Sequence, residues 1–123
     1  MFFIYTKDFF NHLRSELHSE RTIETYCQSL NAFRIYLYET YSKTVDQITT
    51  DFVTEEVIRG FLSSVANSNS VGTRNVRLSG IKAYLKYAAT RDMELVPLQI
   101  SISTVKHKKT YPKRHNWLDK ADI

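Results

Sequence analysis

The chain has only one cysteine, Cys27, among its 123 residues. A single cysteine excludes a disulfide within the chain and a zinc site built from several cysteines, and it is typical of proteins in a reducing compartment. Apolar runs are also short, and none approaches the roughly 18 residues that a membrane span needs. The apolar start, residues 1–5, lacks a basic leader and is followed by Lys7 and Asp8, so no export signal is predicted. We therefore expect a cytoplasmic protein that uses neither a membrane nor a metal.

Acidic residues are missing from one long stretch of the sequence, between Leu95 and Leu118. Five cations are clustered within it: Lys106, Lys108, Lys109, Lys113 and Arg114. Residues 1–66 contain six Lys or Arg and nine Asp or Glu (net −3), whereas residues 67–123 contain eleven and four (net +7), which gives the formal net charge of +4. Clustered cations gain most by displacing counterions from phosphate, so this asymmetry favours a polyanionic partner. A solvated, unstructured tail is the alternative interpretation of the cluster.

Helical periodicity dominates the rest of the sequence. Hydrophobic residues make up 42% and aromatic residues 13% of the chain, well above what disordered segments carry, and the length suits one domain. Apolar residues recur three to four apart in four segments, at about residues 5–17, 20–41, 54–62 and 73–90, and no strand pattern competes strongly. The sequence therefore predicts an all-α fold.

The boundaries of these helices follow from local chemistry. Ser19 and Thr54 can cap the second and third helices with their side-chain oxygens. Residues 63–72 are rich in Ser and Asn, which predicts a loop. After Pro97 apolar and polar residues alternate, which predicts an extended stretch before the basic tail. Cys27 falls on the apolar stripe of the second helix, so we expect a buried, inert thiol.

The fourth helix carries a polar face without acidic residues. Asn75, Ser79, Lys82 and Lys86 follow one another at helical spacing, opposite an apolar stripe. Val76, Gly80 and Ala83 border this face with little bulk, which would let the helix backbone approach a DNA groove closely. The alternative interpretation is that these lysines are ordinary solvent-exposed residues of a surface helix and do not contact DNA.

Two motifs in the sequence resemble hallmarks of one family. The motif in the fourth helix begins with Thr73-Arg74-Asn75-Val76-Arg77-Leu78. It continues with an apolar pattern that ends in an aromatic and a small residue, Tyr87-Ala88. In the second helix, Ser19, Thr22, Ile23, Tyr26, Leu30, Phe33 and Leu37 match the other motif in spacing. This ordered pair, with the Pro112-Lys113-Arg114 and Trp117-Leu118 segments after it, resembles the amino-terminal core-binding domain of tyrosine recombinases, the phage integrases.

The resemblance implies a SAM-like bundle of four to five helices with an extended basic C-terminal tail. It divides the chain into a DNA-binding domain, residues 1–104, and a basic interdomain linker with the start of a catalytic domain, residues 105–123. The implied partners are double-stranded DNA and other recombinase protomers, and we expect the domain alone to be a monomer that needs no cofactor. Catalysis would belong to a further domain, so this chain is not expected to be an enzyme.

The resemblance also implies which residues contact DNA. The residues of the second helix would be Arg21, Thr22, Thr25 and Gln28. Those of the fourth helix would be Thr73, Arg74, Asn75, Arg77, Lys82 and Lys86. Those of the linker would be Lys108, Lys109, Lys113 and Arg114. Tyr111 lies among these cations, and we interpret it as a linker residue rather than a nucleophile, since no buried pocket is expected there to hold a phosphate in line.

Two other functions remain open at this point. Exposed aromatic residues at the start, Phe2, Phe3 and Tyr5, would suit a module that docks on another protein. A helix-turn-helix regulator is the other alternative, but the long second helix and a ten-residue loop before the fourth disfavour it.

Overall fold

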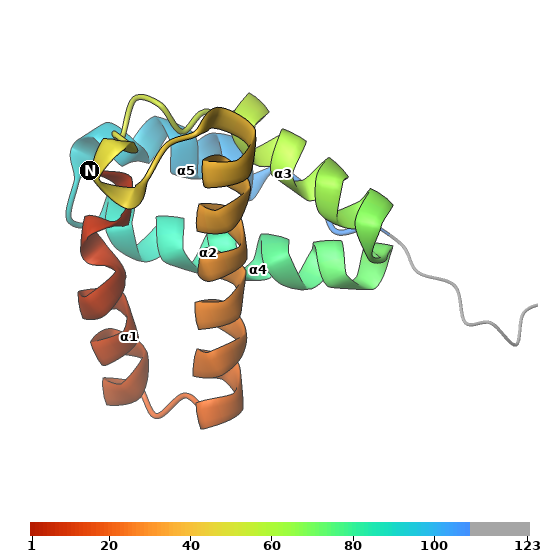
Figure 1. Cartoon of the computed structure of the whole chain (residues 1–123). Coiled ribbons are helices and arrows are strands. Elements are labelled where there is room, and N and C mark those ends of the chain that lie inside the picture. The colour runs from red at the N-terminus through yellow and green to blue at the C-terminus, as the bar shows by residue number, and fades with distance from the viewer. Residues whose placement is uncertain (109–123) are drawn as a thin grey trace, which may run out of the picture.

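The computed structural model describes residues 1–108, and all regular secondary structure in this part of the chain is helical. Figure 1 shows the long helix α2 crossing α4, with α1 beside α2 and with α3 and α5 packed around the crossing. The five α-helices are α1 (Thr6–Ser15), α2 (Glu20–Tyr41), α3 (Glu55–Ser68), α4 (Val71–Ala89) and α5 (Val96–Ser103). Residues 1–108 also contain three short 3-10 helices: η1 (Phe2–Tyr5), η2 (Val45–Gln47) and η3 (Met93–Leu95). The all-α prediction is confirmed.

Side-chain caps set where three of the helices begin. Ser19 Oγ accepts from the backbone N–H of Thr22 (3.1 Å), and Thr54 Oγ1 accepts from that of Val57 (3.3 Å), as predicted. The third cap is Ser70, whose Oγ accepts from the N–H of Thr73 (3.0 Å). Helix α4 therefore begins two residues earlier than Thr73.

The predicted loop over residues 63–72 is wrong, because α3 continues to Ser68. Val65 remains buried, one turn after Phe61 and Leu62, so the core contacts of this face outweigh the loop preference of the Ser and Asn residues. The connection to α4 consists of only residues 69 and 70. The long loop that disfavoured a helix-turn-helix regulator is therefore absent.

The predicted extended stretch after Pro97 is also wrong, because residues 96–103 form helix α5. Pro97 lies in the first turn, where its missing N–H is not needed for a helical hydrogen bond. Ile102 is fully buried, whereas Ile100 is 58% exposed. The alternation of apolar and polar residues was therefore misleading, because it occurs here in a short helix that packs on α4.

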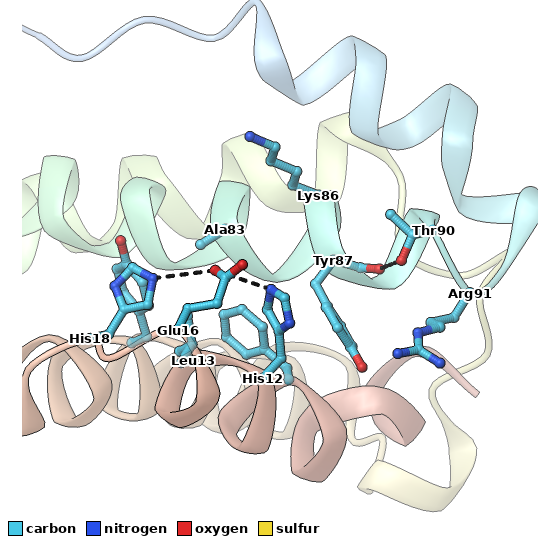
Figure 2. A pocket seen from close by; sticks show the side chains of 11 residues that line it. His12, Leu13, Glu16, His18, Ala83, Lys86, Tyr87, Thr90 and Arg91 are labelled. Atoms are coloured by element: carbon cyan, nitrogen blue, oxygen red, sulfur yellow. Dashed lines mark hydrogen bonds and ion pairs between the residues drawn. The ribbon is translucent and has the colours of Figure 1, made fainter.

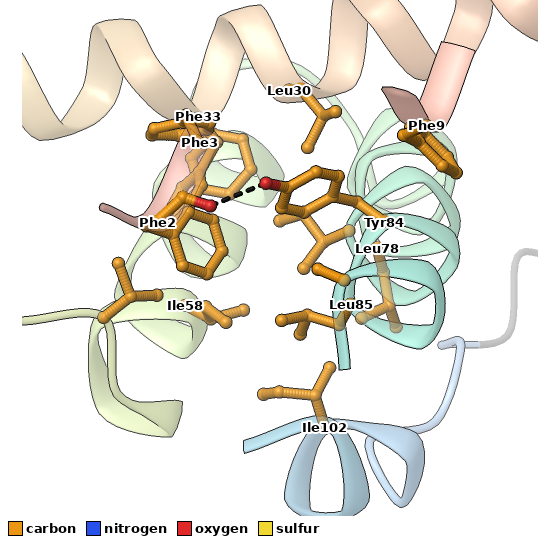
Figure 3. Packing of buried hydrophobic residues seen from close by; sticks show 14 of the residues in the cluster. Phe2, Phe3, Phe9, Leu30, Phe33, Ile58, Leu78, Tyr84, Leu85 and Ile102 are labelled. Carbon is orange, nitrogen blue, oxygen red and sulfur yellow. Dashed lines mark hydrogen bonds between the residues drawn. The ribbon is translucent and has the colours of Figure 1, made fainter. Parts of the chain in front are cut away.

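The start of the chain belongs to the core, contrary to the expectation that Phe2 and Phe3 are exposed. Both are buried, and the N–H of Phe2 donates to Ile48 O (3.0 Å). Figure 3 shows the Tyr84 hydroxyl, which donates to Phe2 O (2.6 Å), while the N–H of Tyr5 donates to that hydroxyl (3.3 Å). Burial raises the pKa of Tyr84 well above its ordinary value. The exposed aromatic cluster that supported a protein-docking module is therefore absent.

Helices α2 and α4 pack closely because both residues at their crossing are small. Gly80 is buried, and a Cβ added to it would lie 2.5 Å from Ser29 Cβ. Ser29 is itself fully buried, and its Oγ donates to Thr25 O (3.0 Å) and Val76 O (3.4 Å). The prediction that Gly80 allows a close approach to a DNA groove is wrong, since the space beside it is filled by α2.

The buried stripe of α2 is narrower than predicted and does not include Cys27. Its buried apolar residues are Ile23, Leu30, Phe33 and Leu37. Cys27 lies about 75° around the helix from the centre of that stripe. The thiol is exposed, so its predicted burial is wrong.

Candidate nucleic-acid interface

The polar stripe predicted on α4 faces outward in the structure. Lys86 is exposed, and Asn75, Ser79 and Lys82 are half-buried. Helix α4 contains four Lys or Arg residues and no Asp or Glu, so nothing on the helix itself neutralises the stripe. This surface, Asn75–Ser79–Lys82–Lys86, is called the α4 stripe below.

The first turns of α2 lie beside the α4 stripe. Arg21, Thr22 and Thr25 line an open groove of about 320 Å³ together with Val76 and Ser79 of α4. Residues that are more than 50 positions apart in sequence, such as Arg21 and Ser79, therefore border one surface. Gln28, the remaining residue predicted on α2, is exposed but does not line this groove.

A short segment after α5, residues 105–108, runs back along α4, and we call it the strap. Its buried residue Val105 anchors it to the core. Asn75 then makes two hydrogen bonds with Lys108, since its Nδ2 donates to Lys108 O (2.7 Å) and its Oδ1 accepts from Lys108 N (2.9 Å). A hydrogen bond of 2.8 Å also joins Ser79 Oγ to His107 Nε2. The strap thus places two lysines and a histidine over the amino-terminal half of the α4 stripe.

The six α4 residues that were predicted to bind DNA have different surroundings in the structure. Asn75, Lys82 and Lys86 lie on the stripe, but both amide atoms of Asn75 are engaged by the strap. Thr73 is held at the helix cap, where its Oγ1 accepts from Ser70 Oγ (3.1 Å). Arg77 is half-buried and lies about 160° around the helix from Ser79.

Arg74 departs most from the expectation of an outward, DNA-contacting side chain. It is only 6% exposed, and its Nη1 donates to Lys106 O (2.9 Å) and Asn75 Oδ1 (3.0 Å). The sequence did contain the signal for this burial, because Arg74 precedes Leu78, Ile81 and Leu85 at core spacing. Of the predicted linker residues, Lys108 lies in the strap, whereas Lys109, Tyr111, Lys113 and Arg114 lie outside the described residues.

A hollow of about 470 Å³ lies on the other flank of α4, against α1. Figure 2 shows His12 and His18 turned toward Glu16, whose Oε1 lies 3.3 Å and 3.7 Å from their Nε2 atoms, while Lys86 extends away from them. Apolar side chains such as Phe9 and Leu13 also line it, together with polar ones such as Arg91. Both imidazoles thus contact one carboxylate at the edge of this hollow.

Neither a metal centre nor a membrane span is found in the described part of the chain. Within residues 1–108, no group of three or more His, Cys, Asp or Glu side chains is arranged to hold a metal ion. None of the helices described there is long and apolar enough to cross a bilayer.

Comparison with known proteins identifies the family. The sequence pattern of the family described as "Phage integrase, N-terminal SAM-like domain" matches residues 6–92, from the start of α1 to just beyond α4. No curated protein and no solved structure matches the sequence. The match covers more than half of the chain and includes both helices that border the groove. The chain therefore belongs to the family of phage integrase N-terminal SAM-like domains.

Proposed function

We propose that this domain binds duplex DNA for a site-specific tyrosine recombinase. Its contact surface would consist of the first turns of α2, the α4 stripe and the strap. The observation that carries the proposal is the docking of a cationic strap on an acid-free helix, because the two together concentrate positive charge on one surface.

Charge along the chain supports this assignment. From residue 71 to residue 108 there are seven Lys or Arg and two Asp or Glu, and the two acids, Asp92 and Glu94, lie beyond α4 in and beside η3. The α2 side is more balanced, since Arg21 lies next to Glu20 and near Glu24. Binding energy from phosphate contacts would therefore come mainly from α4 and the strap.

Base reading would fall to different residues. Phosphate contacts position a protein on DNA, whereas hydroxyl and amide groups can read base edges in the major groove. Thr22, Thr25 and Gln28 on α2 supply such groups. Asn75 could read a base only after its two hydrogen bonds with Lys108 break, so we assign it first to holding the strap.

The catalytic step would belong to another domain of the recombinase, which this proposal requires to carry the tyrosine nucleophile. The linker cations Lys109, Lys113 and Arg114 would continue the phosphate contacts of the strap toward that domain. Other recombinase protomers would bind the same DNA site. In this proposal the chain alone binds DNA and cleaves nothing.

The test is a duplex titration at several salt concentrations. If about five phosphates are neutralised, log affinity falls with a slope of about −4 to −5 against log salt. Replacing Lys82 and Lys86 by Ala should make this slope shallower by about 2, because two phosphate contacts are lost. The melting temperature should hardly change, since neither side chain is part of the buried core.

The matched control replaces two cations on α1, Lys7 and Arg14, which are both exposed. It removes the same net charge, and it should leave the slope close to that of the unmodified chain. Equal losses in both double variants would show that net charge, rather than the α4 stripe, determines binding, and would contradict the proposal.

A further inference from the structure

Arg74 is a buried cation without a counterion in the described structure. The residue is only 6% exposed, and the two hydrogen bonds of Nη1 go to neutral oxygens of Lys106 and Asn75. None of the ion pairs within residues 1–108 involves Arg74. Burying an unpaired charge is costly, so such a residue in a folded domain points to a ligand that supplies the missing negative charge.

Two further cations border the same place. Arg59 of α3 and Lys108 of the strap line a cavity of about 90 Å³ with Arg74, together with Leu62 and Ser63. Burial, and next the charge of Arg59, lower the pKa of the Arg74 guanidinium. Three cations and a hydroxyl-bearing residue therefore surround this space, and no carboxylate from residues 1–108 lines it.

One carboxylate does lie close, but it is already used. Glu55 Oε2 accepts from Arg59 Nε (2.6 Å), and the other oxygen of Glu55 accepts from the hydroxyl of Ser101. Because Glu55 is fixed between α3 and α5, it steadies the Arg59 side chain without lining the cavity. The remaining N–H groups of Arg59 are left to serve another acceptor.

We propose that this cavity binds one backbone phosphate of the duplex, held by Arg59, Arg74 and Lys108 with Ser63 as a further donor. The inference rests on the proposed function and adds a contact from α3, which the sequence did not indicate. The size fits a single anionic group, since the cavity corresponds to about three waters at roughly 30 Å³ each. Guanidinium groups suit it because their planar N–H pairs match phosphate oxygens.

The strap completes this phosphate site. Lys108 lines it, and Asn75 holds the Lys108 backbone at both its N–H and its carbonyl oxygen. Arg74 in turn holds the carbonyl of Lys106. The two residues of the family motif that point toward the strap therefore build a phosphate site instead of reading bases directly.

The experiment compares Arg59→Gln with Arg59→Lys in the full chain by duplex titration over a salt series. Arg59→Gln should make the salt slope shallower by about 0.9 and weaken binding about eightfold at 0.1 M salt, because one fewer counterion is released. Arg59→Lys keeps the charge and should retain the slope. A role of Arg59 confined to its pair with Glu55 would change the melting temperature and leave the slope unaltered, which would overturn the proposal.

A second readout follows the Arg74 Nε–H signal by NMR while inorganic phosphate is added at constant ionic strength, with the duplex as the second titrant. Shifts with both titrants support the site. A response to inorganic phosphate without a slope change in Arg59→Gln would mean a site for free phosphate only, and would overturn the assignment to DNA. If the unmodified chain binds the duplex with the expected salt slope and Arg59→Gln has the same slope, the phosphate site is refuted while the proposed function stands. If the unmodified chain does not bind the duplex, the proposed function itself is refuted.

Discussion

Replacing Gly80 by Ala tests how closely α2 and α4 pack. In an exposed helix this change stabilises a protein by about 1 kcal/mol, because Ala has the higher helix propensity. Here the new Cβ would lie 2.5 Å from Ser29 Cβ and 2.8 Å from Ser29 Oγ. Carbon atoms pack best at about 3.5–4.0 Å, so the two helices would have to separate locally by about 1 Å.

The expected magnitude follows from these opposing terms. Overpacking of a well-packed interior costs about 1–3 kcal/mol, and here it should outweigh the propensity gain. We expect a net loss of about 1–2 kcal/mol in the free energy of unfolding, which lowers the melting temperature of a domain this size by about 5–10 °C. Urea unfolding followed by circular dichroism measures it.

Gly72→Ala provides the matched control in the same helix. Its Cβ would meet only Ser70 Oγ, at 3.7 Å, which is an ordinary contact. This variant should be unchanged or more stable by up to about 1 kcal/mol.

Ser29→Gly offers a second control, because it removes the carbon atom that the new Cβ strikes. Alone it should destabilise α2 by about 1 kcal/mol, and combined with Gly80→Ala it should cost less than the sum of the two changes. A Gly80→Ala variant as stable as Gly72→Ala, or strictly additive losses in the pair, would refute the argument from close packing.

Two further predictions concern the ends of the described chain. Tyr84→Phe should lower stability by about 1–3 kcal/mol, since Phe2 O loses its buried hydrogen bond. Because the pKa of Tyr84 is raised in the folded state, its contribution to stability is present below about pH 10, the ordinary tyrosine value, and is lost as the pH rises above it. Tyr84→Phe should therefore lose less stability at alkaline pH than the unmodified chain. Unfolding measured from about pH 8 to 11 tests this. Asn75→Ala should speed hydrogen exchange at the Lys108 amide with little change in melting temperature, because it removes an exposed contact of the strap; unchanged protection at Lys108 would show that Asn75 does not hold it.

The periodic part of the fold could be predicted from the sequence. Leu78, Ile81 and Leu85 repeat at helical spacing, and the structure buries all three. The caps at Ser19 and Thr54 follow from side-chain chemistry that acts within one turn. Such local signals do not depend on what the helix packs against, so the helices and caps predicted from them are found in the structure.

The errors arose where tertiary contacts decide the outcome. Nothing near Phe2 in sequence reveals that it packs against Tyr84, and nothing near Gly80 reveals Ser29 opposite it. Arg74 is different, because its spacing matched the core while its charge and its place in the family motif indicated the surface. The strap could not be predicted either, since its position depends on hydrogen bonds between residues 33 apart in sequence.

The most direct test of the proposed surface is to add duplex DNA to the ¹⁵N-labelled chain at low salt and record which backbone amide signals shift. The account predicts that shifts concentrate in residues 21–28 of α2, residues 75–86 of α4 and residues 105–108 of the strap. Shifts concentrated on η1 and the outer face of α1, with α4 and the strap unaffected, would contradict it.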